Sequence, residues 1–181
     1  MAKGKRKILA ISGSTRKESS NEMILNLISE LYKETLEVDV FDGIDKLPHF
    51  NPDLDTENPP LLVKDFRDKI QSADGVIICT PEYVFSLPGS LKNAIEWNVS
   101  TTVFSHKPLA IIVAAASGEK ALEALDLIMT TLEVKLAERS KLLIRGIRGK
   151  LNKSGELTDQ STMNQVKKLV ESLMDSIEKE N

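Results

Sequence analysis

The sequence contains few of the residues that bind metals or cross-link a chain. Its 181 residues include one cysteine, Cys79, and two histidines, His49 and His106. A single cysteine excludes an intramolecular disulfide framework and any cysteine-rich zinc or iron–sulfur site. The two histidines lie far apart in the chain and match no spacing of metal ligands. We therefore expect no metal site.

Long apolar runs and a strong excess of one charge are also missing. No run reaches the roughly 18 apolar residues that a membrane-spanning helix needs. The 24 basic and 27 acidic residues leave a net charge of −3, which argues against nucleic-acid binding. We interpret the basic start, residues 1–7, as a solvated lead-in to a strand, since the apolar run after it is too short for a secretory signal. We expect a cytoplasmic protein with neither nucleic-acid nor membrane partners.

Short apolar runs alternate with segments of helical periodicity along the whole chain, without repeats, low-complexity blocks or linkers. We therefore expect a single domain over residues 1–181. The predicted strands are 8–11, 38–41, 76–79, 109–116 and, within a less clear region, Val134–Ala137. The predicted helices are 20–32, 60–73, 90–99, a stretch from Leu122 to Leu132, and one from Val166 to Ile177, with a long loop over 42–59. This order predicts an α/β fold in which helices cover both faces of a doubly wound, five-stranded parallel sheet of order 2-1-3-4-5.

Ligands of such sheets bind at the carboxyl ends of the strands, which directs attention to the loops there. The first of them, Ser12 to Asn21, holds five hydroxyl residues, one asparagine, one arginine and one lysine, and it leads directly into a helix. A helix N-terminus offers unpaired N–H groups, and hydroxyl and guanidinium groups add further donors for an anion. Helix capping by Ser19 or Ser20 explains only one or two of these residues. Because the glycine patterns of nucleotide and dinucleotide sites are absent, the loop favours a single phosphate monoester.

A second loop, Thr80 to Trp97, follows the predicted strand at 76–79. It carries two aromatic side chains, Tyr83 and Phe85, that a hydrophilic surface loop would not normally show, although local packing or a subunit contact is the alternative. Aromatic surface beside backbone donors suits a planar heterocycle. We expect Trp97 to belong to the core or an interface, and Cys79 to be a buried and unreactive residue.

Together these two loops resemble the NADPH-dependent FMN reductase family, which includes flavodoxin-like quinone, azo-dye and chromate reductases. The resemblance is carried by Ile11 to Asn21, read as I-x-G-S-x-R-x-x-S-x-N, and by Pro81 to Trp97, read as P-E-Y-x-x-S-x-P-G-x-L-K-N-A-I-x-W. It implies a flavodoxin-like fold, bound FMN, and NADPH or NADH as the electron donor. It also implies a homodimer or homotetramer and a small flat acceptor such as a quinone, a free flavin or an azo compound, reduced in a ping-pong cycle.

The resemblance also assigns roles to residues, none of which is itself catalytic because FMN carries the redox chemistry. The phosphate would be held by Ser14, Arg16, Ser19 and Asn21. The isoalloxazine ring would be lined by Glu82, Tyr83, Val84 and Phe85, in a loop shaped by Ser86 and Gly89. The far edge of the ring would touch Ala115, Ala116, Ser117 and Gly118, and the same FMN-binding set includes Thr15, Ser20 and Pro81.

Two departures from the family pattern stand out. Many relatives have asparagine where this chain has Val84, so a side-chain amide is missing beside the ring, and Glu119-Lys120 replace a glycine-rich run. Two other functions use the same architecture: a flavodoxin-type electron carrier and a flavin-binding regulator without turnover. Arg16 and the modest net charge argue against the carrier, whose phosphate loop normally lacks arginine and whose surface is strongly acidic.

Overall fold

Five short runs form the strands of one parallel sheet in the computed structural model, which describes residues 4–41, 43–152 and 154–179. The strands are β1 (Arg6–Ser12), β2 (Leu36–Phe41), β3 (Gly75–Thr80), β4 (Leu109–Ala115) and β5 (Lys141–Arg145). Their order across the sheet is β2-β1-β3-β4-β5, which confirms the predicted flavodoxin-like fold. Residues 1–3 of the basic lead-in lie outside the described residues.

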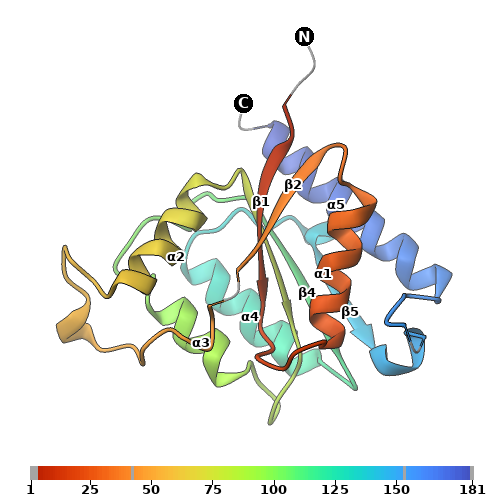
Figure 1. The fold of residues 1–181 in the computed structure, drawn as a ribbon, viewed down its shortest axis with the longest axis horizontal. Helices are drawn as coiled ribbons and strands as arrows, with labels where there is room; N and C mark the ends of the chain where they lie inside the picture. The colour runs from red at the N-terminus through yellow and green to blue at the C-terminus, as the bar shows by residue number, and fades with distance from the viewer. Residues whose placement is uncertain (1–3, 42, 153, 180–181) are drawn as a thin grey trace.

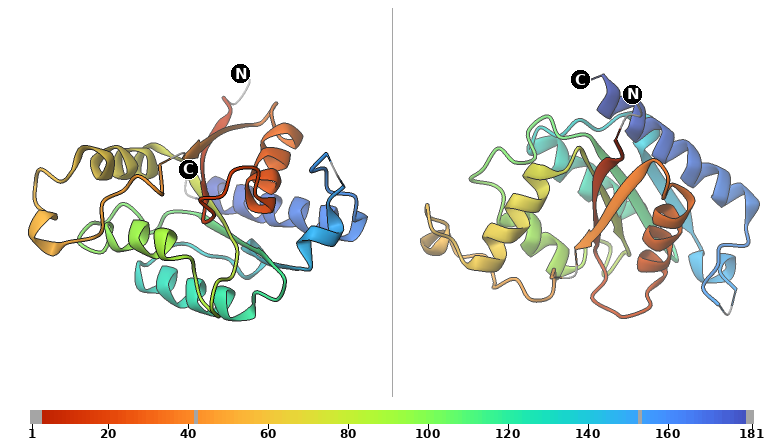
Figure 2. Two further views of the ribbon diagram at one scale, coloured as in Figure 1. Left: turned by 60° about the horizontal axis from the view of Figure 1, so that its bottom comes forward. Right: turned by 45° about the horizontal axis from the view of Figure 1, so that its top comes forward.

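Helices cover both faces of this sheet (Figures 1 and 2). They are α1 (Ser20–Leu31), α2 (Leu61–Ser72), α3 (Gly89–Glu96), α4 (Glu119–Thr131) and α5 (Gln160–Glu178). The apolar sides of α1 and α5 pack on one face of the sheet, and those of α2, α3 and α4 pack on the other. Side chains alternate between the two faces along each strand, so the central strands β3 and β4 are buried throughout.

The fifth strand lies later in the chain than the sequence predicted. Residues Val134–Ala137 make only an isolated parallel bridge, between Lys135 and Pro108, and the edge strand β5 forms at Lys141–Arg145 instead. Residues 134–137 alternate apolar residues with a charged and a small one, whereas β5 has three consecutive apolar residues between Lys141 and Arg145. Only the later one pairs in register with β4 over its whole length, from Ile111 with Lys141 to Ala115 with Arg145. The prediction of a strand at 134–137 was therefore wrong.

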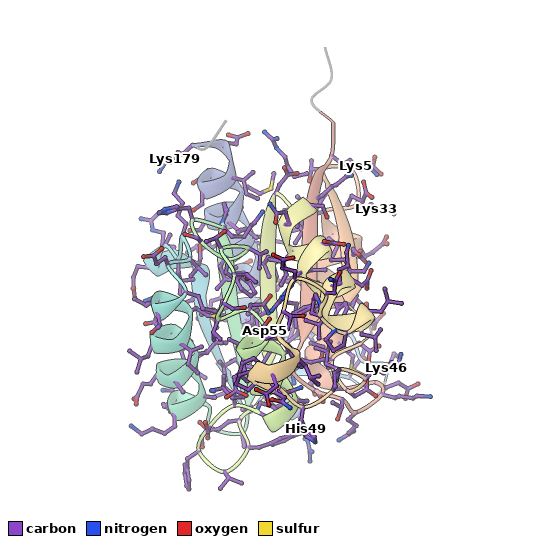
Figure 3. The ribbon with its side chains drawn as sticks, turned by 90° about the vertical axis from the view of Figure 1, so that its left-hand side faces the viewer. Lys5, Lys33, Lys46, His49, Asp55 and Lys179 are labelled. Carbon is purple, nitrogen blue, oxygen red and sulfur yellow. The ribbon has the colours of Figure 1, made fainter. Side chains whose placement is uncertain are left out.

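The long loop between β2 and α2 is held against the α3 end of the molecule. Figure 3 labels Asp55 on this loop, and its carboxylate pairs with the Arg67 guanidinium at 2.7 Å and accepts from the Ser100 hydroxyl at 2.6 Å. The indole N–H of Trp97 donates to the Pro48 carbonyl at 2.7 Å, and the Phe50 ring packs edge-on against the indole. Trp97 is fully buried, which confirms its predicted place in the core.

All five strands run in the same direction, so the loops after β1, β3, β4 and β5 gather at one edge of the sheet, at the bottom of Figure 1. No helix among the described residues is long and apolar enough to cross a membrane. The same residues contain no cluster of three or more metal-ligating side chains. Attention therefore turns to this edge of the sheet.

Candidate functional site

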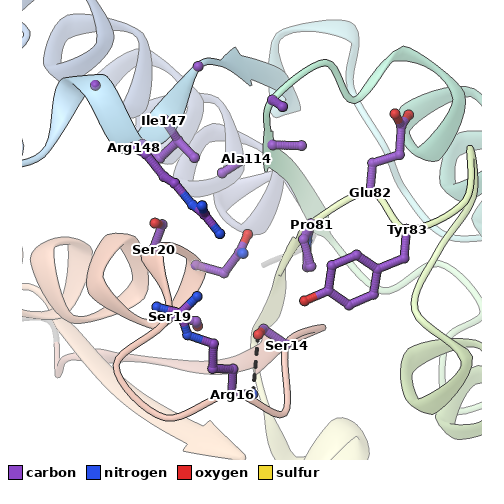
Figure 4. A pocket seen from close by; sticks show the side chains of 15 residues that line it. Ser14, Arg16, Ser19, Ser20, Pro81, Glu82, Tyr83, Ala114, Ile147 and Arg148 are labelled. Carbon is purple, nitrogen blue, oxygen red and sulfur yellow. Dashed lines mark hydrogen bonds between the residues drawn. The ribbon is translucent and has the colours of Figure 1, made fainter.

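A cavity of about 480 Å³ opens between the four loops at the carboxyl edge of the sheet (Figure 4). This volume lies in the range of small-molecule sites, roughly 300–1,000 Å³. The loop after β1 lines one side of the cavity, and the loop after β3 lines the opposite side. Its lining residues are Ser14, Arg16, Ser19, Ser20, Asn21, Pro81, Glu82, Tyr83, Ala114, Ala115, Ala116, Gly146, Ile147, Arg148 and Gly149.

The loop after β1 is folded by its own hydroxyl groups. The Ser12 hydroxyl accepts from the Ser14 N–H at 3.3 Å, and the Ser14 hydroxyl accepts from the Arg16 N–H at 3.3 Å, as the dashed line in Figure 4 marks. Between them Gly13 passes so close to β3 that a Cβ atom there would collide with the Thr80 side chain. The Ser14 oxygen already accepts a hydrogen bond, so its own O–H can donate into the cavity.

The same loop ends at the N-terminus of α1. Ser19 is the N-cap, and its hydroxyl accepts from the Glu22 N–H at 3.1 Å, so its O–H can also donate elsewhere. Met23 donates to the Ser19 carbonyl. The backbone N–H groups of Ser20 and Asn21 lie in the first turn of the helix, before this first intrahelical bond. They have no acceptor among the described residues. The helix dipole adds partial positive charge at the same point, so this wall of the cavity favours an anion.

Asn21 is oriented by the one cysteine of the chain. The buried Cys79 thiol donates to the Asn21 Oδ1 atom at 3.3 Å, and burial raises the pKa of this thiol, so it keeps its proton. Because a thiol proton requires an acceptor, the contact assigns the oxygen of the Asn21 amide to Cys79. Asn21 lines the cavity, and its amide nitrogen is left to donate to a ligand there. The prediction that Cys79 is buried is confirmed.

The loop after β3 makes a two-residue hairpin at the opposite wall. Tyr83 and Ser86 exchange two backbone hydrogen bonds of 3.0 Å. The two central residues have positive φ angles, 51° at Val84 and 56° at Phe85, which is the conformation of a type I′ turn. Their side chains are 94% and 79% exposed and do not line the cavity, whereas Pro81 and Tyr83 do. The backbone of the hairpin therefore turns these two side chains outward.

Glu82 ties this hairpin to α4. Its Oε2 atom accepts from the Lys120 and Ala121 N–H groups, each at 3.0 Å. The N-cap of α4 is Gly118, which has no side chain to cap the helix, so Glu82 supplies the missing acceptor from another loop. The glutamate lies at the rim of the cavity, but its carboxylate is engaged by α4 (Figure 4).

The segment after β5 contributes a cation that the sequence interpretation missed. Arg148 lies on a short 3-10 turn, η3 (Ile147–Lys150), and Figure 4 shows its side chain directed into the cavity. The turn begins after Gly146, whose φ of 63° suits glycine, and the Gly146 N–H donates to the Ala115 carbonyl at 2.9 Å. This bond brings η3 to the carboxyl end of β4. The two glycines at 146 and 149, after a charged end of a strand, are the sequence signal that could have pointed to this loop.

The structure brings most of the sequence-predicted site residues together. Nine of them line the cavity: Ser14, Arg16, Ser19, Ser20, Asn21, Pro81, Glu82, Tyr83 and Ala116. Seven do not line it: Thr15, Val84, Phe85, Ser86, Gly89, Ser117 and Gly118. Thr15 lines a neighbouring cavity of about 390 Å³, beside Lys17 and the end of β2. The FMN contacts of all sixteen residues stay predictions.

The chemistry of the cavity fits FMN. Its α1 side holds the donors of the hydroxyls, the amide, the helix N-terminus and two guanidinium groups, as a phosphate requires. Its other side is built by Pro81, the Tyr83 ring and the three alanines at the end of β4, a surface that suits a flat ring. The donor-rich part and the apolar part lie at separate walls of one cavity, so a phosphate and a heterocycle joined by a short chain can occupy both.

Comparison with known proteins also leads to FMN-dependent reductases. The profile of the NADPH-dependent FMN reductase family matches residues 6–146. A quinone reductase of Pseudomonas putida is 32% identical over 160 residues, which cover 85% of this chain and 86% of that protein. A quinone reductase of Escherichia coli strain K12 is 30% identical over 166 residues, which cover 88% of each. FerB of Paracoccus denitrificans, a flavoenzyme NAD(P)H:(acceptor) oxidoreductase of solved structure, is 28% identical and superposes with a TM-score of 0.81, covering 96% of this chain and 98% of FerB.

Proposed function

Because the chain belongs to the NADPH-dependent FMN reductase family, we propose that it passes electrons from NADPH or NADH, through bound FMN, to a small flat acceptor such as a quinone. At the coarser level the chain is an oxidoreductase that uses FMN and NAD(P)H. The acceptor and the order of the steps are the part that we propose.

The contribution of the chain begins with the phosphate. Ser14, Ser19 and Asn21 each have a donor left for the cavity after their internal hydrogen bonds, and Arg16 adds a permanent charge. A phosphate monoester there receives hydroxyl, amide, guanidinium and backbone N–H donors at once. This convergence on the N-terminus of α1 is the observation that carries the proposal.

When bound, FMN supplies the hydride and electron transfer that the side chains of this cavity do not. Pro81, Tyr83 and Ala114–Ala116, which line the cavity, would hold the ring and shield that side of it from water. Beyond a bound ring, the outer side of the cavity would be left for a second flat molecule. We propose that the nicotinamide and the acceptor use this one open side in turn, since a single stacking surface admits one of them at a time.

Calorimetric titration of the flavin-free protein with FMN, FAD and riboflavin tests the cofactor assignment. We expect FMN to bind most tightly, because the donor-rich wall is built for one phosphate. Weaker binding of riboflavin measures the phosphate contribution directly. Tighter binding of FAD than of FMN would contradict the proposal.

Initial rates of NADPH oxidation at several fixed quinone concentrations test whether the nicotinamide and the acceptor use one side of the cavity in turn. We expect parallel lines in double-reciprocal plots, since the first product must leave before the acceptor enters. Intersecting lines would show that donor and acceptor bind together. The homodimeric or homotetrameric state and the cytoplasmic location stay predictions from the sequence.

A further inference from the structure

The last residue of β5 and the η3 turn after it carry three basic side chains, Arg145, Arg148 and Lys150, and two of them are already paired. The Arg145 guanidinium contacts the Glu119 carboxylate at 2.6 Å. The Lys150 ammonium donates to Asp159 at 2.9 Å and to the Thr162 hydroxyl at 2.8 Å. Arg148, between them, has no hydrogen-bond or ion-pair partner among the described residues, and it lines the main cavity. Its charge is therefore available to a ligand.

The backbone around Arg148 is fixed on both sides. Ile147 is buried in the core beneath α5, and the Gly146 N–H is bonded to the end of β4. On the other side, the Lys150 contacts join η3 to the first turn of α5. A short turn anchored at each end presents the Arg148 side chain toward the cavity with little freedom in its backbone.

Arg148 and Arg16 approach the same part of the cavity from different elements. Figure 4 shows both side chains directed toward the place where Ser19 and Ser20 begin α1. Arg16 also has no side-chain partner among the described residues. The one carboxylate that lines the cavity, Glu82, is bonded to the N-terminus of α4 instead. Two guanidinium groups without a carboxylate partner and a helix N-terminus thus favour an anion with more than one negative charge.

We propose that Arg148 is a second guanidinium ligand of the FMN phosphate, and that it makes the site selective for a dianionic phosphate monoester over an unphosphorylated flavin. This inference rests on the proposed function, since it concerns the same cavity. A phosphate monoester carries about 1.5–2 negative charges near neutral pH, as phosphorylated side chains do. Arg16 alone leaves part of that charge unmatched, and Arg148 closes the phosphate site from the β5 side.

The test compares FMN and riboflavin binding in two matched variants. Arg148→Gln removes the charge at the cavity, and Arg145→Gln removes the same charge three residues earlier, where the side chain pairs with Glu119 and does not line the cavity. Flavin fluorescence titrations of the flavin-free proteins give the dissociation constants. For Arg148→Gln we expect FMN affinity to fall by about ten- to hundred-fold, the range for a charged hydrogen bond. Riboflavin affinity should not change, and Arg145→Gln should bind both flavins as the parent protein does.

Other results of these titrations would contradict either the role of Arg148 or the proposed function. A parallel loss of FMN and riboflavin affinity in Arg148→Gln would overturn the inference, because it would show that Arg148 shapes the cavity rather than binding phosphate. Unchanged FMN affinity would also overturn it, and a raised KM for NADPH in that case would assign Arg148 to the electron donor. A parent protein that binds FMN no better than riboflavin would instead contradict the phosphate site of the proposed function itself.

Discussion

Arg16 is the cation that the sequence already placed in the phosphate loop. Its guanidinium has no partner among the described residues and lines the cavity beside the α1 N-terminus. We expect Arg16→Ala to weaken FMN binding by about 1.5–3 kcal/mol, the range for hydrogen bonds to charged groups. Isothermal titration measures the change. Lys17→Ala is the matched control, since Lys17 lies next in the chain but lines only the neighbouring cavity. Equal losses in the two variants would show a general electrostatic effect rather than a contact.

Val84 is held in a backbone conformation that β-branched residues avoid. Its φ is 51° and its side chain is 94% exposed, so no packing compensates for the conformation. Left-handed backbone costs an ordinary L-residue roughly 1–2 kcal/mol, whereas asparagine adopts it readily. We expect Val84→Asn to raise the free energy of unfolding of the flavin-free protein by about 1 kcal/mol, as measured by urea denaturation.

The same substitution separates two roles of position 84. Because the side chain points away from the cavity, Val84→Asn should leave FMN affinity unchanged. Val84→Thr is the control: it stays β-branched and should give no gain in stability. A clear gain in FMN affinity in the asparagine variant would support the ring contact that the family resemblance implied, with the hairpin adjusting on binding.

At the scale of elements, Glu82 connects the hairpin after β3 to the start of α4. We expect Glu82→Ala to cost about 0.5–2 kcal/mol of stability, as loss of a helix cap does, and to loosen the wall that Tyr83 forms. Glu82→Gln keeps an acceptor for the Lys120 and Ala121 N–H groups and should retain most of the stability. Thermal unfolding of the three proteins without flavin measures the difference. An alanine variant as stable as the glutamine variant would rule out the capping role.

The N-terminus of α5 depends on the charge of Asp159. Hydrogen bonds from the Thr162 hydroxyl, the Lys150 ammonium and the Thr162 N–H lower the pKa of this carboxyl from 3.8 to about 2. Because the folded pKa is below the unfolded one, the stabilisation is complete above pH 3.8 and is lost as the pH falls toward 2. The stability difference between the parent protein and Asp159→Asn should therefore shrink over this window in urea titrations. A difference that stays constant with pH would contradict the assignment.

The elements that the sequence predicted well are those whose burial is continuous. Runs such as Ile8 to Ile11 and Val76 to Cys79 are apolar throughout because strands in the middle of a parallel sheet are covered on both faces. The edge strand β5 has no such signal, because its ends are Lys141 and Arg145 and one side pairs with no strand. The stronger alternation at 134–137 therefore misplaced the strand.

The wrong position of the predicted fifth strand explains why Arg148 was not predicted as a site residue. With the fifth strand at 134–137, the segment from Gly146 to Gly149 lies far past the end of the strand, and nothing places Arg148 at the cavity. Residues on the β1 and β3 loops were found because they follow strands whose ends were predicted closely. The outward turn of Val84 and Phe85 depends on backbone angles that neither residue type favours, so no pattern of residues predicts it.

At the scale of the whole molecule, the cavity joins parts of the chain that fold onto different faces of the sheet. α1 and η3 belong to the side covered by α1 and α5, whereas the hairpin after β3 leads into α3 on the other side. The lining residues extend from Ser14 to Gly149, so most of the fold must be intact for the cavity to exist. A ligand that fills it binds the folded state and has no comparable site in the unfolded chain.

Binding should therefore stabilise the protein against global unfolding. At one hundred times its dissociation constant, a ligand of the native state adds about 2.7 kcal/mol. For a chain of this size each kcal/mol raises the unfolding temperature by about 2–4 °C, so FMN at that concentration should raise it by about 5–10 °C. Differential scanning calorimetry with increasing FMN measures the shift. Riboflavin at the same concentration should raise it less, because it leaves the donors around Ser14, Arg16 and the α1 N-terminus unused. FMN that quenches in a binding titration yet leaves the unfolding temperature unchanged would show that FMN does not bind the folded protein in preference to the unfolded chain.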